Sequence, residues 1–202
     1  MFTYIYEKLI DPLLRDVRKK VVKLSRLSSG EKVLDICCGT GAQVIEYGSS
    51  GIIAIGIDIN PNMFKKASKR RKLLEMENVS FYVGDSRNLP FADNSFACII
   101  VSFGLHDKST RQRYRIVSEM KRVVQQDGTL IFVDFNVPLP NNIWGKIARI
   151  IEFIVGGSHY KGFKDYILRG GLSDIFRNCR LEPNYVSNTI GGLCAIAKTN
   201  MP

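Results

Sequence analysis

This sequence of 202 residues has few of the side chains that bind metals or form disulfides. It has two histidines, His106 and His159, and five cysteines without a C-x-x-C pair. An odd number of cysteines without that spacing argues against a zinc ribbon or a disulfide framework. We therefore expect reduced thiols packed as small apolar groups, and no bound metal.

The sequence also lacks a long apolar run, since no stretch reaches the roughly 18 residues of a membrane-spanning helix. Its first residues, MFTYIYEKLI, have neither the basic start nor the cleavage site of a secretory signal. We expect a cytoplasmic protein that is at most peripheral on the inner face of the membrane. The formal net charge of +10 indicates that the surface attracts anions, whether nucleic acid or acidic lipid headgroups.

Apolar strands alternate with helical segments along most of the chain. We expect strands at residues 32–36, 52–59, 79–84, 95–103 and 129–135, and helices at 13–30, after Gly41, and at 61–76 and 110–125. Such alternation is typical of a parallel sheet with helices on both faces. Further helices are expected at 141–155 and 163–178, and two closing strands at 181–188 and 191–199 are joined by a tight turn.

The fold class is therefore α/β, with a Rossmann-like, mostly parallel sheet of seven strands and helices on both faces. The length favours a single domain over residues 1–202. We divide this domain into an N-terminal helical lid (1–30), a ligand-binding core (31–135) and a substrate-side part with the closing strands (136–202). The patterns specify no oligomeric state.

The stretch VLDICCGTGAQ places Asp35 and two glycines, Gly39 and Gly41, directly after the first expected strand. Ligands of open parallel sheets bind beyond the carboxyl ends of the strands, and glycines permit close backbone approach there. Val44 occupies the place of the third glycine of G-x-G-x-x-G, which argues against a pyrophosphate.

Two more carboxylates follow neighbouring strands. Asp58, after the second expected strand, could accept both hydroxyls of a ribose, and Asp85, after the third, could accept from an exocyclic amine. A ligand with a ribose, an adenine amine, a positive charge and no phosphate fits these groups. S-adenosylmethionine has all of these features.

Four stretches in order carry a resemblance to a known family: VLDICCGTGAQ, GIDINPNMFKKA, GDSRNLPFADNSFACIIVSFGLHD and EMKRVVQQDGTLIFVDF. The chain resembles class I S-adenosylmethionine-dependent methyltransferases, and more narrowly the C-methyltransferases of ubiquinone and menaquinone biosynthesis. The resemblance implies a methyltransferase that uses S-adenosylmethionine and methylates a ring carbon of a small or lipid-like, quinone-type acceptor. By this resemblance the cofactor-binding residues are Asp35, Gly39, Thr40 and Gly41 for the methionine part, Asp58 with its neighbour Ile59 for the ribose, Asp85 and Ser86 for the adenine, and Ser102 near the sulfonium.

The sequence departs from the quinone family where the acceptor should bind. The usual FGLRN of that family is FGLHD here, and the usual LEFS is VDFN. His106, oriented by Asp107, could draw a proton from the acceptor hydroxyl, although a loop histidine can also be only a solvated polar residue. His159 and Tyr160 could likewise either take part in the chemistry or be only solvated polar residues.

Two other functions compete with quinone methylation. The stretch HYKGFKDYILRGGL also resembles phospholipid and small-molecule methyltransferases, so N-methylation of a headgroup or another amine is the alternative. Nucleic-acid methylation is prompted by the charge and by the basic run KKASKRRK at residues 65–72. The loop SFGLHDKS lacks both the Pro-Pro-aromatic box and the Pro-Cys nucleophile of those enzymes, which argues against it. A non-catalytic module that only binds the cofactor is the third class.

The segment NNIWGKIARIIEFIV predicts an amphipathic helix whose isoleucines repeat at helical spacing, with Glu152 on the opposite, polar side. The isoleucine stripe could pack over the sheet or the active site. It could also form, with the basic N-terminal helix, a lid that admits a lipid-like acceptor from an anionic membrane. The basic residues of that N-terminal helix are Arg15, Arg18, Lys19, Lys20 and Lys23.

Overall fold

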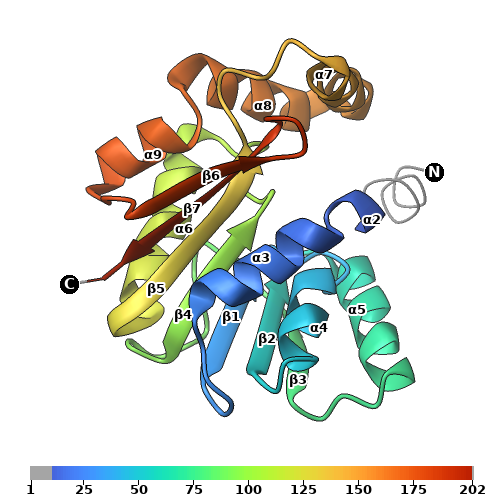
Figure 1. The fold of residues 1–202 in the computed structure, drawn as a ribbon, viewed down its shortest axis with the longest axis vertical. Helices are drawn as coiled ribbons and strands as arrows, with labels where there is room; N and C mark the ends of the chain where they lie inside the picture. The colour runs from blue at the N-terminus through green and yellow to red at the C-terminus, as the bar shows by residue number, and fades with distance from the viewer. Residues whose placement is uncertain (1–10, 202) are drawn as a thin grey trace.

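A seven-stranded sheet forms the centre of the protein (Figure 1), in a computed structural model that describes residues 11–201. The strand order is β3-β2-β1-β4-β5-β7-β6. The first five strands are parallel, whereas β7 runs antiparallel to β5 and pairs with β6 in the closing hairpin. The predicted α/β fold with a mostly parallel sheet is confirmed.

The first half of the chain alternates strands and helices as predicted. Its elements are α2 (Asp11–Leu13), α3 (Arg15–Ser25), β1 (Lys32–Ile36), α4 (Ala42–Gly48), β2 (Ile53–Asp58), α5 (Pro61–Leu73), β3 (Val79–Val83) and β4 (Phe96–Ser102). The N-terminal helix ends earlier than expected, because Arg26 adopts a left-handed conformation after Ser25. The Asn60 side chain caps α5 and Pro61 begins it, which explains the sharp start of that helix.

The second half departs from the sequence prediction in two places. Its elements are α6 (Thr110–Val123), β5 (Val124–Phe135), α7 (Ile143–Val155), α8 (Gly157–Arg169), α9 (Leu172–Cys179), β6 (Tyr185–Thr189) and β7 (Cys194–Asn200). The expected turn at residues 126–128 is an irregularity within β5, where the register with β4 shifts. The single helix expected at 163–178 is two helices, because Gly170 and Gly171 both take positive φ angles, of 96° and 65°.

Two hydrophobic cores cover the two faces of the sheet. One contains α6, α8 and α9, with Ile116, Tyr166 and Ile175 fully or almost fully buried against β4 and β5. The other contains α3, α4 and α5, with Val21 and Ala67 buried against β1 and β2. Because α4 follows β1 on one face and α6 follows β4 on the other, the tips of these adjacent strands are left uncovered by the helices that succeed them.

Helix α7 buries the side that carries Glu152, which the sequence pattern marks as polar. Its buried residues are Gly145, Ala148 and Glu152, while the isoleucine stripe points mostly to solvent. Gly145 faces the chain at Pro140, whose carbonyl oxygen leaves no room for a Cβ atom. Figure 1 shows α7 and α8 beyond the tips of β4 and β5. Among residues 11–201, the structure has no helix with the length and apolarity that spanning a membrane would require.

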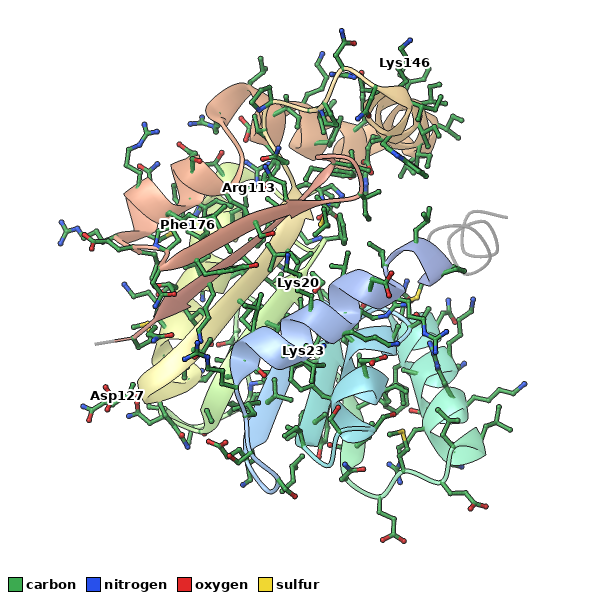
Figure 2. The ribbon with its side chains drawn as sticks, viewed as in Figure 1. Lys20, Lys23, Arg113, Asp127, Lys146 and Phe176 are labelled. Atoms are coloured by element: carbon green, nitrogen blue, oxygen red, sulfur yellow. The ribbon has the colours of Figure 1, made fainter. Side chains whose placement is uncertain are left out.

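Arg113 joins α6 to α8 and to the loop after β4 (Figure 2). Its guanidinium donates to the carbonyl oxygens of Leu105 (3.0 Å), His106 (3.3 Å) and Gly162 (2.6 Å) and pairs with Asp165 at 2.7 Å. The side chain is 1% exposed. A buried cation with all three of its nitrogens engaged fixes the backbone that it binds, so Arg113 holds the loop that carries His106.

We expect Arg113→Met to lower the free energy of unfolding by about 3 kcal/mol or more, because three carbonyl oxygens and the Asp165 carboxylate each lose a charge-assisted hydrogen bond. Chemical denaturation measures this loss. Arg111→Met, an exposed position on the same helix, is the matched control and should change stability by less than about 0.5 kcal/mol. Equal, small effects of both substitutions would contradict the anchoring role.

Candidate active site

A cavity of about 390 Å³ lies at the tips of β1 and β4, where the winding of the sheet reverses. One end is lined by the glycine loop after β1 and by Asp58 at the tip of β2. The other end is lined by apolar side chains of α2, α3, α7 and the segment before β7, among them Leu13, Val17, Trp144, Ile147, Ile151, Ile190 and Leu193. The cavity therefore joins a polar end at the glycine loop to a mostly apolar end, which also contains the polar side chains of His106, Glu152 and His159.

Asp58 organises the polar end. Its Oδ2 accepts from the Gly39 N–H and its Oδ1 from the Asn60 N–H, both at 2.9 Å. The carboxylate thereby ties the loop after β1 to the tip of β2, while each oxygen keeps a lone pair for a ligand. Gly39 has a φ angle of 53° with open space where a Cβ would stand, so its backbone can be approached closely.

Asp35 and Ser102 place two buried, unpartnered oxygens at the cavity. Asp35 Oδ1 and Ser102 Oγ make no hydrogen bond with any part of residues 11–201. Burial, and next the charge of Asp58, raise the pKa of the Asp35 carboxyl well above its ordinary value. A buried acceptor without a donor is costly, so this position favours a ligand that brings a cationic or hydrogen-bonding group.

The structure does not bring every predicted cofactor residue to the cavity wall. Thr40 lines it, whereas Gly41 begins α4 behind it, with a φ angle of 74°. Ile59 is exposed, at 61%. The Asp85 carboxylate is engaged by Arg87, with contacts of 2.6 to 3.0 Å, and Ser86 Oγ accepts from Cys37 Sγ at 3.5 Å. The adenine contacts expected of Asp85 and Ser86 therefore remain a prediction.

His106 lies at the apolar end with a different partner from the one expected. Its Nδ1 is 2.8 Å from Asp134 Oδ1, so Asp134, not Asp107, orients the ring. The reason is the sheet: β4 and β5 are parallel neighbours, and their tips bring positions 106 and 134 together. Burial lowers the pKa of the His106 imidazole, but Asp134 and Glu152 outweigh it, so the pKa lies above its ordinary value.

Asp107 instead faces His159 of α8. His159 Nδ1 is 3.5 Å from Asp107 Oδ2, and Lys108 Nζ contacts both Asp107 oxygens at 2.7 Å. Burial opposes ionisation of Asp107, but His159 and Lys108 hold its pKa below the usual range. His159 Nε2 lies 2.7 Å from Glu152 Oε2 of α7. Asp107 and Glu152 raise the pKa of His159 to about 9.

Sequence reasoning missed four residues of this site. Asp134 and Glu152 carry the two buried carboxylates beside His106, and their strand and helix patterns alone gave no signal that both contact this histidine. Cys37 and Phe103, at the tips of β1 and β4, both have left-handed φ angles, of 57° and 53°. Such conformations in residues other than glycine are typical of functional sites, but a sequence does not display them.

Comparison with known proteins gives a family. The family model described as "ubiE/COQ5 methyltransferase family" matches residues 13–144. A demethylmenaquinone methyltransferase from Listeria welshimeri is 32% identical over 74% of this chain and 65% of its own length. A relative of the same name from Desulfitobacterium hafniense is 30% identical over 92% of this chain and 79% of its own length. The chain thus spans about 65% of the length of the Listeria relatives.

Solved structures give the fold. A SAM-dependent methyltransferase from Aquifex aeolicus superposes with a TM-score of 0.73 at 20% identity, covering 100% of this chain and 99% of that one. Magnesium protoporphyrin IX methyltransferase from Synechocystis, solved with bound SAH, has a TM-score of 0.68 at 18% identity, with 95% and 83% covered. With a matching fold and a family model that covers residues 13–144, this chain belongs to the ubiE/COQ5 methyltransferase family.

Proposed function

We propose that the chain transfers a methyl group from S-adenosylmethionine to a ring carbon of a quinone-type acceptor in its hydroquinone form. The observation that carries this proposal is the continuous cavity, polar at the glycine loop and apolar toward α7. The relatives named demethylmenaquinone methyltransferase, at 30–32% identity, support the acceptor class.

The polar end fits the methyl donor. Asp58 offers free lone pairs to the ribose hydroxyls, and the unpartnered Asp35 oxygen suits the positive charge of the methionine part. Gly39 and Thr40 line the same end with their backbone and side chain. When bound, S-adenosylmethionine supplies a methyl carbon on a cationic sulfur, so that transfer breaks the sulfur–carbon bond and leaves its electron pair on sulfur.

The chain's own part in the reaction is alignment and control of a proton. Phe103, Trp144 and Ile151 line the cavity and exclude water from an apolar ring. His106, oriented by Asp134, stands at the same end and draws the proton from the acceptor hydroxyl, which makes the adjacent ring carbon a stronger nucleophile. After the new carbon–carbon bond has formed, the ring carbon loses its own proton to water and the ring oxygen regains a proton from His106.

The acceptor class is tested by methyl transfer from labelled S-adenosylmethionine to a panel of acceptors. Reduced demethylmenaquinone should be methylated, while phosphatidylethanolamine, a small amine and tRNA should not. The product is identified by the position of the labelled methyl group. Methylation of nitrogen in the phospholipid or the amine, without ring methylation, would replace the quinone proposal by the N-methylation alternative.

Asp58→Ala should weaken binding of S-adenosylmethionine at least tenfold, because charge-assisted hydrogen bonds are worth about 1.5–3 kcal/mol each. The same substitution frees the Gly39 N–H, which adds to the loss. Calorimetric titration measures the affinity. Glu77→Ala, an exposed carboxylate just before β3, is the control and should bind as the unaltered chain does. Unchanged affinity in Asp58→Ala would remove this residue from the site.

We further propose that α7 rests on an anionic membrane and that the cavity receives its acceptor there. The α7 outer face (Ile143, Ile150, Phe153, Ile154) is exposed, and Lys146 and Arg149 of the same helix are exposed cations. Figure 2 labels Lys146 at the outer side of α7. An exposed apolar face with flanking cations is the pattern of interfacial helices.

The N-terminal helix contributes less charge to this surface than its sequence indicates. Arg15, Lys19 and Lys23 of α3 are exposed, but Lys20 Nζ donates to Ser187 Oγ at 2.7 Å and Arg18 lines the cavity. Leu13, Leu14 and Val17 line the cavity as the proposed lid requires. The first ten residues of that lid lie outside the described residues.

Sedimentation with vesicles tests the membrane proposal. The chain should bind vesicles that contain phosphatidylglycerol more than neutral ones, and less at high salt, because each basic residue near an anionic surface contributes about 1 kcal/mol. The double substitution Ile150→Asp, Phe153→Asp should abolish this binding, whereas Leu168→Asp, an exposed apolar position on α8, should not. Negligible binding of the unaltered chain to both vesicles would defeat the proposal.

A further inference from the structure

Three potential metal ligands from different elements meet at the cavity. They are His106 of the loop after β4, Glu152 of α7 and His159 of α8, and all three line the cavity. His159 Nε2 is 2.7 Å from Glu152 Oε2, and His106 Nε2 is 3.7 Å from Glu152 Oε1. One ligand atom of each residue lies within 4.8 Å of the others. This spacing is close to that of donors around one small cation.

The two imidazoles are held in the same way. His106 Nδ1 faces Asp134 at 2.8 Å, and His159 Nδ1 faces Asp107 at 3.5 Å. In both rings Nδ1 contacts an aspartate carboxylate and Nε2 is directed toward Glu152. Metal-binding histidines are commonly oriented by such an outer carboxylate, which fixes the tautomer and leaves the other nitrogen lone pair for the metal.

Two ligand atoms lack a hydrogen bond. Apart from their mutual ion-pair contact at 2.7 Å, Glu152 Oε2 and His159 Nε2 are buried without a hydrogen-bonded partner among residues 11–201. Glu152 is 5% exposed. Buried polar atoms without partners are rare and call for a missing ligand, water or ion.

The local charge also points to a cation. Asp107 is paired with Lys108 at the edge of the cluster. Asp134 and Glu152 are two buried carboxylates, and their ion-pair partners within residues 11–201 are imidazoles, not lysine or arginine side chains. A divalent cation between the histidines would balance them, and uncompensated buried charge is strongly unfavourable.

We propose that His106, Glu152 and His159 bind one divalent first-row transition metal ion, for which Zn²⁺ is the best match. Two imidazoles and one carboxylate are a zinc donor set of the catalytic type, whereas Mg²⁺ and Ca²⁺ prefer sites made of oxygen alone. Three protein ligands leave a coordination position open toward the cavity. The expectation of no metal, which rested on cysteine and histidine spacing, would then be corrected by tertiary contacts.

The role of this ion rests on the proposed function. The open position would take the hydroxyl oxygen of the acceptor, and a metal-bound oxygen gives up its proton more readily. His106 would then be a ligand of the ion in place of the base described above, and the hydroxyl proton would pass to water. His106 and Asp134 occupy the motifs at which the sequence departs from the quinone family, so the site would distinguish this chain within it.

The metal is tested on the full chain, without methyl donor or acceptor. After treatment with a chelator, the chain is titrated with Zn²⁺ by calorimetry and with Co²⁺ by visible absorption. We expect one equivalent bound per chain and a Co²⁺ spectrum without the intense near-ultraviolet band of thiolate ligands, which excludes the free cysteines as the site. Zn²⁺ should also raise the melting temperature.

Variants show whether these residues are the ligands. Glu152→Gln and His159→Gln should each lower Zn²⁺ affinity at least 100-fold, and Asp134→Asn should lower it about 10- to 100-fold. Glu77→Gln is the matched control and should leave the affinity unchanged. His159 is partly exposed, so its variant remains informative if Glu152→Gln does not fold.

The absence of one tight equivalent, or undiminished binding in both Glu152→Gln and His159→Gln, would overturn the proposal. Either result would mark the cluster as an ion-pair network between α7 and α8. Because these titrations use the metal alone, they can fail while methyl transfer is observed, and methyl transfer can fail while the metal binds.

Discussion

The reversal of winding between β1 and β4 is the constraint on which the rest of this structure depends. After β1 the chain turns onto one face of the sheet, and after β4 onto the other, so the helices that directly follow these strands leave the space above their shared tips open. The space must be bounded by loops and by whatever later segments can reach it. The glycine loop closes one side, and α7 and α8 close the other. The same constraint brings side chains far apart in the sequence to one cavity.

Carboxylates lie in or beside that cavity at both of its ends. At one end burial, and next the charge of Asp58, raise the pKa of Asp35, and a bound cationic ligand would favour its ionised form. At the other end Asp134 and Glu152 contact the imidazoles of His106 and His159, and burial leaves the charges of these groups poorly screened by solvent. Since unpaired buried charge is unstable, these carboxylates favour a positive charge beside them, carried either by a proton on a histidine or by a metal ion. The fold thus creates two regions of the same cavity that attract positive charge.

Helix α7 shows how tertiary structure can reverse the meaning of an amphipathic pattern. Its isoleucine stripe has the periodicity of a core-facing helix, yet the buried side is the one with Gly145, Ala148 and Glu152. Small residues allow α7 to approach the chain at Pro140 closely, and Glu152 faces the two histidines. The apolar side is thereby left outward, where it can meet a lipid surface. Burial of a carboxylate is unfavourable unless the group is paired. The histidines that pair with Glu152 cannot be identified from the periodicity of the helix.

The sequence by itself determined the sheet, its two helical faces and the glycine loop, because strand and helix periodicities and the spacing of Asp35, Gly39 and Gly41 are local properties. It also indicated His106 as a residue of interest. Only the tertiary structure decided that Asp134 orients His106, that Glu152 and His159 join it, and that the α7 stripe faces outward. Strand register and helix docking bring these residues together although the contacting pairs are 28 positions (His106 and Asp134), 46 positions (His106 and Glu152) and 7 positions (Glu152 and His159) apart in the sequence. No local pattern encodes such pairings, because they depend on where the parallel strands end and on how Arg113 fixes the loop between them.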